Sequence, residues 1–413
     1  MKNLFDLFVD SLKSRREKCI DKKDIFQLPY VLLRENNSKD ELRSLGVFFT
    51  SQCLAERLIK RTGVFEATRK VYDPAAGAGD LLLAYADMLP IYDSVEETIE
   101  SWSSKIYATD IEDSFIKILK LRLILLATLK LQGEVSLKDI DLGKVDDVFN
   151  NIYVGNFQDF YFDVDLILVN PPYSAILPEV KYQWASGKVS NAAVFLFELQ
   201  RRYPSVTIAA IVPDVMRSGS RYAKLRKELS GFAMDKEVPV GRFDKFTDVD
   251  VFFAVSHLGC QNVKMESLPI MGRALGDYYT IKVGSVVPHR DVQEGVECYY
   301  LTARNVSTNK EIRRFKEKIR SLHNPVKGPF IVVKRTSSPS DKVRCAASLI
   351  ASKSLFHIEN HLLLLLPNHN VSLKQSREHL KYLNGLEVTH YLNQAIRCRH
   401  LTVEVVKKIP IKE

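Results

Sequence analysis

The pattern of hydrophobic and polar positions predicts short buried strands that each end in a polar residue. The clearest case is residues 166–169, Leu-Ile-Leu-Val, an aliphatic run that stops at Asn170. A short apolar run bounded by a breaker is typical of a strand buried on both faces of a parallel sheet. Pro171 and Pro172 lack the N–H group that a sheet ladder needs, so the strand must end there. In open α/β sheets, ligands bind at this carboxyl edge.

Two more segments repeat this arrangement. Residues 71–73 form a short strand that ends in an aspartate, and a glycine-rich turn and an apolar helix follow over residues 74–83. Residues 106–110 form another strand that ends in an aspartate, and the apolar positions of residues 115–131 predict a long helix after it. The alternation of strands and helices predicts an α/β fold with a mostly parallel sheet.

The start of the chain predicts helices instead. Leu4, Phe5, Leu7 and Phe8 recur at helical spacing. Residues 1–45 are too few for an ordinary separate domain, so we expect them to form a helical cap on the core.

Composition and charge limit the classes of partner that the chain could bind. The chain has 413 residues, of which 46% are hydrophobic and 26% charged, as in globular proteins with room for two domains. No apolar run approaches the ~20 residues of a membrane span, and the six cysteines form no CxxC pair. We therefore expect a cytoplasmic protein without membrane association. Residues 281–413 hold 23 of the 59 lysines and arginines but only 11 of the 50 acids, a surplus of +12. This surplus predicts contact with a polyanion, unless it is only a solvated basic surface.

The side chains of Asn170-Pro171-Pro172-Tyr173 suit one kind of chemistry. Asn170 offers an amide oxygen and Pro171 a backbone carbonyl. Two acceptors on a rigid turn can hold an amino group with its lone pair directed at an electrophile. Tyr173 offers a flat ring on which a planar base can stack. The alternative is a strand followed by a proline turn, with Tyr173 in ordinary packing.

The turn at residues 73–79, Asp-Pro-Ala-Ala-Gly-Ala-Gly, suits a ligand that carries an ammonium group. Gly77 and Gly79 permit a tight backbone and a close approach of the ligand, and the carboxylate of Asp73 suits an ammonium better than a phosphate. The spacing is not G-x-G-x-x-G, and no Lys-Ser/Thr pair follows. Neither a dinucleotide site nor a P-loop is therefore indicated.

Three further polar residues stand where a nucleoside-like ligand would meet them. Asp110 ends a strand, the place at which nucleotide-binding units hold a ribose. Asp159, flanked by Phe157 and Phe160, suits an exocyclic amine beside a purine. Thr50 precedes a helix whose first N–H groups can bind a carboxylate. Each also has an ordinary alternative role in helix capping, loop solvation or core packing.

Taken in this order, the motifs resemble the gamma class of S-adenosylmethionine-dependent N6-adenine DNA methyltransferases from restriction-modification systems. The resemblance covers roughly residues 40–265, beginning with Phe-Phe-Thr at residues 48–50. It implies a Rossmann-like class I methyltransferase domain at residues 46–266, with a mixed, mostly parallel sheet and helices on both faces. A smaller α+β domain that recognises the DNA target is expected at residues 267–413, and the helical cap at residues 1–45 precedes both.

The resemblance also implies roles for single residues. Those expected to bind S-adenosylmethionine are Thr50, Asp73, Ala75, Gly77, Gly79, Asp110, Ile111, Asp159 and Phe160. Those expected to be catalytic are Asn170, Pro171 and Tyr173. Tyr173 and Phe246 are expected to stack on the adenine that is flipped out of the duplex.

In the C-terminal region, residues 329–336 and 343–347 predict two strands joined by a Ser/Pro turn. Cations around this turn and near the C-terminus are expected to contact DNA: Lys334, Arg335, Lys342, Arg344, Arg397 and Arg399. His357 and His361 have the spacing of a helical metal site, but the neighbouring apolar run predicts a strand, so no metal is expected. The polar residues 178–188 predict a flexible loop that orders on DNA.

Together these features predict an enzyme that transfers a methyl group from S-adenosylmethionine to N6 of a flipped adenine in double-stranded DNA. It would be the modification enzyme of a restriction-modification or phage-defence system, with a cognate restriction endonuclease as its candidate partner. Two alternatives stay open: a methyltransferase acting on RNA adenine or protein glutamine, and a DNA-binding modification subunit that is inactive without partners. The basic C-terminal region and the leading Phe-Phe-Thr favour DNA.

Overall fold

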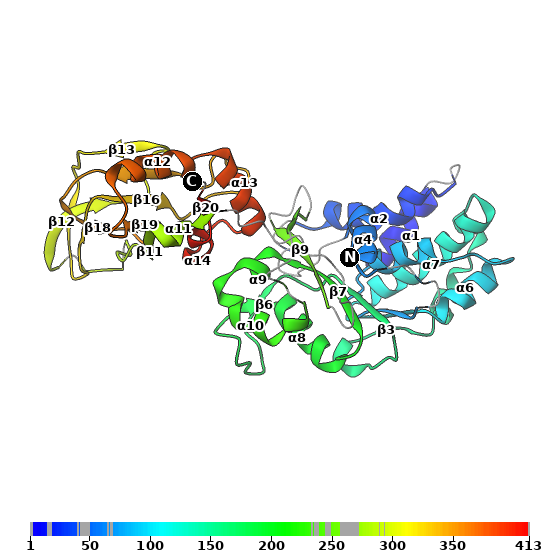
Figure 1. Ribbon diagram of the computed structural model, residues 1–413. Helices are drawn as coiled ribbons and strands as arrows, with labels where there is room; N and C mark the ends of the chain where they lie inside the picture. Colours follow the sequence, from blue (N-terminus) through cyan, green and yellow to red (C-terminus); the bar gives the residue numbers. More distant parts are fainter. Residues whose placement is uncertain are drawn as a thin grey trace. The chain divides into compact units, whose positions relative to one another are not determined.

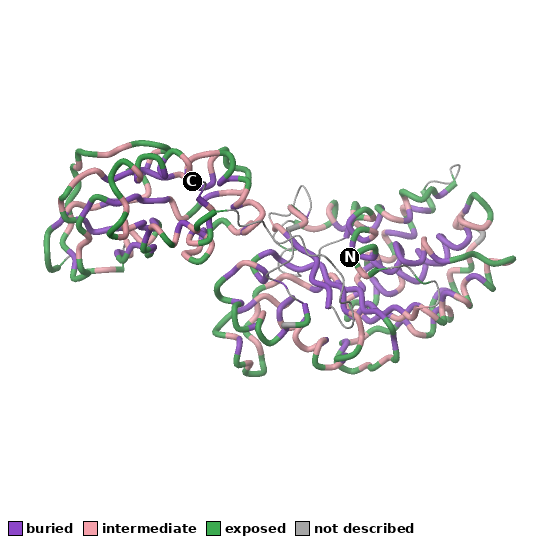
Figure 2. The backbone as a smooth tube through the Cα atoms, in the orientation of Figure 1, coloured by how far each residue is buried: buried purple, intermediate pink, exposed green. Residues whose placement is uncertain are grey.

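The computed structural model describes residues 3–14, 19–38, 41, 50–63, 66, 69–232, 234, 239–243, 249–256, 272–288, 290–292 and 294–411. The chain divides into two compact units (Figure 1). The first comprises Met1–Met216, Ala223–Glu237 and Val251–Val263, and the second comprises Arg217–Tyr222, Val238–Asp250 and Lys264–Glu413. Figure 2 shows buried backbone along the strands and inner helices of each unit.

A seven-stranded sheet has the strand order β3-β2-β1-β4-β7-β9-β8. Its strands are β1 (Val71–Asp73), β2 (Ile106–Asp110), β3 (Ile152–Val154), β4 (Leu166–Val169), β7 (Thr207–Pro213), β8 (Pro239–Arg242) and β9 (Asp250–Val255). Strands β3, β2, β1, β4 and β7 run parallel, and β9 is antiparallel to β7. The predicted α/β fold with a mixed, mostly parallel sheet is confirmed.

The strand order reverses beside β1. The chain runs from β1 to β2 and β3 on one side and then returns to β4 on the other. Tyr72 of β1 is accordingly paired with Tyr107 of β2 and with Ile167 of β4. Such a reversal leaves a crevice at the carboxyl ends of the two central strands. Asp73 and Asn170 stand at this point, at the ends of neighbouring strands.

Helices connect the strands of the sheet. They are α4 (Gln52–Arg61), α5 (Asp80–Met88), α6 (Val95–Ser103), α7 (Asp113–Gln132), α8 (Asn191–Arg202), α9 (Asp214–Ser218) and α10 (Ala223–Glu228). Short 3-10 turns are η1 (Leu137–Asp139), η2 (Leu142–Asp147), η3 (Phe157–Asp159), η4 (Ser220–Tyr222) and η5 (Ser230–Phe232). The predicted long helix at residues 115–131 is α7, which is buried on nearly all sides as a central helix is.

The described residues of the start of the chain form helices, as predicted for this segment. Helices α1 (Leu4–Ser14) and α2 (Lys22–Asn36) both pack against α7. Asp21 caps α2 by accepting from the N–H of Asp24, which fixes where this helix begins. Pro29 lies in the interior of α2, and its consequence for α7 is described below.

The segment after the Asn-Pro-Pro-Tyr motif contains the loop predicted at residues 178–188. It is held at its base by β5 (Ala175–Ile176) and β6 (Val189–Ser190), which pair antiparallel. Trp184 is buried, stacks on Tyr182 at 5.3 Å between ring centroids and packs against Phe197 of α8. Residues 178–188 thus form a loop, as the sequence predicts, with one buried aromatic, and its ordering on DNA stays a prediction.

The second unit contains two main sheets, with the orders β11-β19-β16-β17-β13 and β14-β12-β18-β15, and a β10-β20 pair. Its strands are β10 (Arg273–Ala274), β11 (Tyr279–Val283), β12 (Val296–Leu301), β13 (Lys310–Ile312), β14 (Lys318–Ser321), β15 (Val326–Lys327), β16 (Phe330–Lys334), β17 (Ala347–Ile350), β18 (Leu355–Ile358), β19 (Leu362–Pro367) and β20 (Pro410–Ile411). Its helices are α11 (Leu275–Tyr278), α12 (Leu373–Leu383), α13 (Leu386–Ala395) and α14 (Val403–Lys407). The predicted strand pair is present as β16 and β17, although β17 begins only at Ala347.

Across these described ranges, no helix is long and apolar enough to cross a membrane.

Candidate functional site

The carboxyl ends of β1, β2 and β4 open into a cavity of about 1100 Å³ in the first unit. Asp73, Asp110 and Asn170 all line it, so the fold brings together three predicted site residues that are far apart in the sequence. Thr50, Ala75, Gly77 and Ile111 line the cavity as well. Helices α1 and α2 contribute Leu7 and Leu33, so the N-terminal segment forms part of its wall.

The glycine turn shapes one side of this cavity. Gly77 has a φ of +52°, and its N–H donates to Oδ2 of Asp110 at 2.7 Å, which ties the ends of β1 and β2 together. Gly79 does not line the cavity. It has a φ of +90°, and a Cβ there would collide with Leu119 of α7. Gly79 therefore permits close packing of the turn on α7, and only Gly77 of the two glycines faces the ligand space.

Three aspartates line the cavity, Asp73, Asp80 and Asp110, and burial raises the pKa of each. Burial raises the pKa of Asp73 well above its usual range, the N–H of Ala75 opposes that rise, and the Asp110 carboxylate adds to it. Burial likewise raises the pKa of Asp110, against the hydrogen bonds donated by the N–H groups of Glu112 and Gly77. Buried carboxylates of this kind favour a positively charged or hydrogen-bond-donating ligand, because such a ligand stabilises their ionised form.

Thr50 is placed to do more than cap a helix. The N-cap of α4 is Ser51, whose hydroxyl accepts from the N–H of Leu54, so the Thr50 hydroxyl is left for other partners. Thr50 Oγ1 accepts from Nδ2 of Asn170 at 3.0 Å, and the Thr50 N–H donates to Oδ2 of Asp80 at 2.9 Å. This buried threonine therefore links the start of α4 to the Asn-Pro-Pro-Tyr turn.

Tyr173 also contacts Asn170. Its hydroxyl donates to Oδ1 of Asn170 at 2.7 Å and lies 3.1 Å from the carbonyl oxygen of Ile211. Burial raises the pKa of Tyr173 well above its usual range, so the hydroxyl stays protonated. Neither Tyr173 nor Pro171 lines the cavity, whereas Pro172 does. In this structure Tyr173 orients the asparagine, and its expected role as a stacking surface stays a prediction.

Near the end of β3, sequence reasoning missed Asn156, and it considered Phe157 beside the purine but chose Phe160 as the cofactor ligand. Asn156 and Phe157 line the cavity, and Phe157 packs against Phe195 with 4.5 Å between ring centroids. The expected ligands Asp159 and Phe160 do not line it. Asp159 is exposed, and Phe160 stacks on Tyr153. Asn156 and Phe157 follow closely after the carboxyl end of β3, and Asp73 and Asp110 stand at the carboxyl ends of their own strands. Position after a strand is the sequence signal that points to the two cavity-lining residues.

All six residues expected to contact DNA lie in the second unit, and they differ in how far they are exposed. Lys342 and Arg399 are exposed, and Lys334 and Arg335 are half-buried. Arg397 pairs with Asp250 at 2.9 Å. Phe246, the expected second stacking residue, lies outside the described residues.

Arg344 contradicts the expectation of a phosphate contact, because it is fully buried. Its guanidinium donates to Ser337 Oγ, to Asn393 Oδ1 and to the carbonyl oxygen of Cys398. It therefore holds the fold of the second unit together from inside.

The two histidines considered for a metal site lie on or next to a strand. His357 is buried in β18, and its Nε2 contacts the carbonyl oxygen of Val296 at 2.8 Å. His361 immediately precedes β19, so the pair does not share a helix face.

Comparison with known protein families identifies this arrangement. The family model described as N-6 DNA Methylase matches residues 21–229, half of the chain. This range includes the residues from Thr50 to Asn170 that line the cavity. The chain belongs to the N-6 DNA methylase family. This membership confirms the predicted class of enzyme, an N6-adenine DNA methyltransferase catalytic region with S-adenosylmethionine as its cofactor.

Comparison with solved structures supports the assignment of the fold. The chain resembles the type IIL restriction-modification enzyme MmeI, whose structure is in complex with DNA, with 9% identity over 92% of this chain and 69% of that one and a TM-score of 0.53. It also matches a structure described as the modification subunit of a proposed type I restriction enzyme from Vibrio vulnificus YJ016, with 20% identity and a TM-score of 0.37. That match covers 56% of this chain and 49% of that subunit, so the chain spans about half the length of this relative. No curated protein matches the sequence.

Proposed function

We propose that this N-6 DNA methylase is a site-specific enzyme that methylates N6 of an adenine flipped out of double-stranded DNA. The observation that carries the proposal is the placement of Asp73 and Asn170 at the ends of neighbouring strands, in one cavity of a chain from this family. Asp73 suits the charged tail of the methyl donor, and Asn170 suits the amino group that receives the methyl. The cavity has room for both, since ligand sites typically measure ~300–1000 Å³.

The residues of the cavity fit S-adenosylmethionine, which supplies an electrophilic methyl group when bound. Asp73 would hold the amino group of its methionine tail, and Thr50 with the first N–H groups of α4 would hold the carboxylate. Asp110 would hold the ribose, with Ala75 and Gly77 along the nucleoside. Ile111, exposed in this structure, and the ring of Phe157 would enclose the adenine, with Asn156 at its edge.

Hydrogen bonds with Thr50 and Tyr173 orient the side-chain amide of Asn170. Because Thr50 accepts from Nδ2 and Tyr173 donates to Oδ1, the orientation of the amide is fixed. An amide oxygen has two lone pairs, so Oδ1 can accept a hydrogen bond from the target amine while Tyr173 keeps its own. The carbonyl of Pro171 is the proposed second acceptor. Two acceptors draw the amine out of conjugation with the base, and positioning of this kind supplies much of the rate.

We assign DNA recognition to residues 267–413, the α+β domain expected from the sequence. The basic surplus of residues 281–413 supports this assignment, since phosphate contacts dominate DNA affinity. Besides Lys334, Arg335, Lys342 and Arg399, a cluster of exposed cations on and before β14 comes into consideration: Arg313, Arg314, Lys316, Lys318 and Arg320.

Partners and location follow from the same proposal. The chain would act on cytoplasmic DNA as the modification enzyme of a restriction-modification or phage-defence system, beside a cognate endonuclease. The MmeI structure in complex with DNA supports duplex DNA as the partner.

Transfer of a labelled methyl group to duplex DNA tests the proposal. The wild-type chain is incubated with labelled S-adenosylmethionine and unmethylated double-stranded DNA of mixed sequence, and the product is digested to nucleosides. We expect label in N6-methyl-2′-deoxyadenosine only, and none above background with Asn170→Ala. Label on RNA, on protein or on cytosine would refute the proposal, and activity that appears only with added partner subunits would identify a modification subunit instead.

A further inference from the structure

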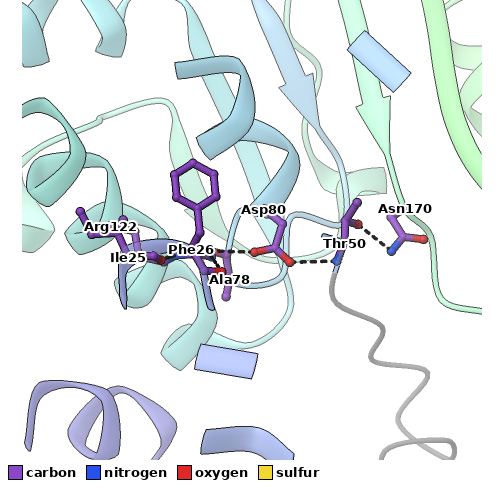
Figure 3. A network of polar contacts seen from close by, with 7 residues as sticks. All are labelled: Ile25, Phe26, Thr50, Ala78, Asp80, Arg122 and Asn170. Atoms are coloured by element: carbon purple, nitrogen blue, oxygen red, sulfur yellow. Dashed lines mark hydrogen bonds and ion pairs between the residues drawn. The ribbon is translucent and has the colours of Figure 1, made fainter. Parts of the chain in front are cut away.

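A buried arginine outside the cavity is connected to the catalytic asparagine by a continuous polar network (Figure 3). Arg122 of α7 is fully buried. Its Nε donates to the carbonyl oxygen of Ile25 at 2.6 Å, and its Nη2 donates to that of Phe26 at 3.0 Å. Its Nη1 donates to the carbonyl oxygen of Ala78 in the glycine turn. Three of its contacts therefore join α2 and the glycine turn through one guanidinium.

The sequence explains why α2 has a carbonyl to offer. Pro29 has no N–H group, so the carbonyl of Ile25, four residues earlier, receives no helical hydrogen bond. A carbonyl left unpaired in a buried place destabilises the fold. The Nε of Arg122 provides the missing donor. The interior proline of α2 and the buried arginine of α7 are thus complementary.

The network continues toward the cavity through Asp80. Nη2 of Arg122 donates to Oδ1 of Asp80 at 2.9 Å, and Oδ2 of the same carboxylate accepts from the Thr50 N–H at 2.9 Å. Thr50 Oγ1 in turn accepts from Asn170 Nδ2 at 3.0 Å. Arg122 and the Thr50 N–H both donate to the Asp80 carboxylate, one to each oxygen, and Asn170 donates to Thr50. The position of Asn170 therefore depends on Thr50, that of Thr50 on Asp80, and that of Asp80 on Arg122.

We propose that Arg122 and Asp80 are positioning residues for methyl transfer, which hold Thr50 and through it the amide of Asn170, and which make the N-terminal helix α2 part of the catalytic apparatus. The proposal rests on the proposed function, because it concerns the same site. A planar guanidinium is suited to this place, since it offers five donors in a fixed fork. A buried ion pair by itself is poor support for stability, so a role in geometry is the better reason for its presence.

The variant Asp80→Asn breaks the network at one point and preserves its volume. The amide oxygen of the new asparagine can still accept from Arg122, but its NH2 group then faces the Thr50 N–H, donor against donor. Arg122→Lys is the second variant, since an ammonium retains the charge but cannot hold three carbonyls and a carboxylate in the same geometry. The matched control is Lys130→Met. Lys130 also lies on α7 and donates to three carbonyl oxygens, those of Ala86, Asp87 and Leu89. In the described part of the chain no path of hydrogen bonds leads from it to Asn170.

At saturating S-adenosylmethionine and DNA, we expect Asp80→Asn to lower kcat by about 10- to 100-fold, the cost of a misplaced reactive group. The kcat of Arg122→Lys should lie between that of Asp80→Asn and that of wild type. Lys130→Met should lower the unfolding temperature while kcat stays within about twofold of wild type. A kcat within about twofold of wild type for both Asp80→Asn and Arg122→Lys would overturn the proposal, as would an equal loss in Lys130→Met.

A double-mutant cycle separates positioning from general stability. Thr50→Val keeps the N–H that Asp80 holds but removes the acceptor for Asn170. If Asp80 acts through Thr50, adding Asp80→Asn to Thr50→Val should lower kcat by no more than about a further twofold. If the effect of Asp80→Asn is purely structural, the fold-losses of the two single variants should multiply in the double variant.

A second readout does not depend on activity. The side-chain amide resonance of Asn170, observed with selective asparagine labelling and assigned by its loss in Asn170→Ala, should shift in Asp80→Asn and Arg122→Lys but not in Lys130→Met. An unmoved resonance refutes the network. An inactive wild-type chain, in contrast, refutes only the proposed function.

Discussion

The hydroxyl of Tyr173 donates a hydrogen bond to Oδ1 of Asn170 at 2.7 Å, from within the same four-residue turn. The sequence predicts that the ring of Tyr173 stacks on the target base. The hydroxyl contact adds a second function, because it fixes which side of the Asn170 amide carries oxygen. The two functions can be separated by substitution.

We predict that Tyr173→Phe lowers kcat by about fivefold, since one neutral hydrogen bond contributes ~1 kcal/mol. Tyr173→Ala should lower it further, because a base-stacking surface worth ~1–3 kcal/mol is lost as well. Asn170→Ala should lower the rate of methyl transfer by several orders of magnitude and leave the affinity for S-adenosylmethionine nearly unchanged. Steady-state transfer of labelled methyl to duplex DNA checks all three. If Tyr173→Phe equals wild type, the hydroxyl has no orienting role.

The second prediction concerns the charge of Asp73. Asp73→Asn should weaken S-adenosylmethionine binding by about 10- to 100-fold, since hydrogen bonds to charged groups contribute ~1.5–3 kcal/mol. It should also raise the unfolding temperature of the cofactor-free protein at neutral pH. Because burial raises the pKa of Asp73, the folded state favours the neutral acid, and the ionised carboxylate costs stability at any pH above that pKa. The asparagine removes this cost and can still accept from the Ala75 N–H.

The same pKa shift predicts a pH dependence. Cofactor binding requires the ionised carboxylate, so wild-type affinity should fall as the pH is lowered through the raised pKa of Asp73, before an ordinary aspartate would protonate. Calorimetry across this range checks it, with Asp73→Asn as the control in which this fall disappears. An affinity that is independent of pH in the wild type would exclude Asp73 as the partner of the ammonium group.

A third prediction separates two candidates for the end of β3. The sequence favours Asp159, whereas the cavity contains Asn156. We predict that Asn156→Ala weakens S-adenosylmethionine binding by about fivefold, the value of one hydrogen bond, while Asp159→Ala changes it by less than twofold. Asn156 Oδ1 also accepts from the N–H of Gln158, so Asn156→Asp, which keeps that contact, shows whether the loss is due to the turn. The opposite order of effects would restore the assignment to Asp159.

The catalytic turn could be predicted from sequence because its signals are local. An aliphatic run that ends in two prolines permits one interpretation, and β4 ends where that run does. The end of β3 gave no such signal, since Tyr153 and Val154 are exposed and the strand is only three residues long. Arg344 and Arg122 were not predictable for a further reason. Charged residues are expected at the surface, and only their tertiary partners show why these two are buried.

The last prediction uses the burial of Arg344 to test how the second unit binds DNA. Exposed cations that neutralise phosphates release counterions, so each lowers the slope of log affinity against log salt by about one when it is removed. Lys342→Ala and Arg399→Ala should do so, with similar losses on specific and unrelated duplexes. Arg344→Met should leave the slope unchanged and lower the unfolding temperature, because Ser337 and Asn393 lose a buried donor. Fluorescence titrations of labelled duplex at several salt concentrations, with thermal unfolding of each variant, provide the measurement. A reduced slope in Arg344→Met at a temperature where the variant is folded would mean that this arginine reaches phosphate after all, and that the second unit opens to bind DNA.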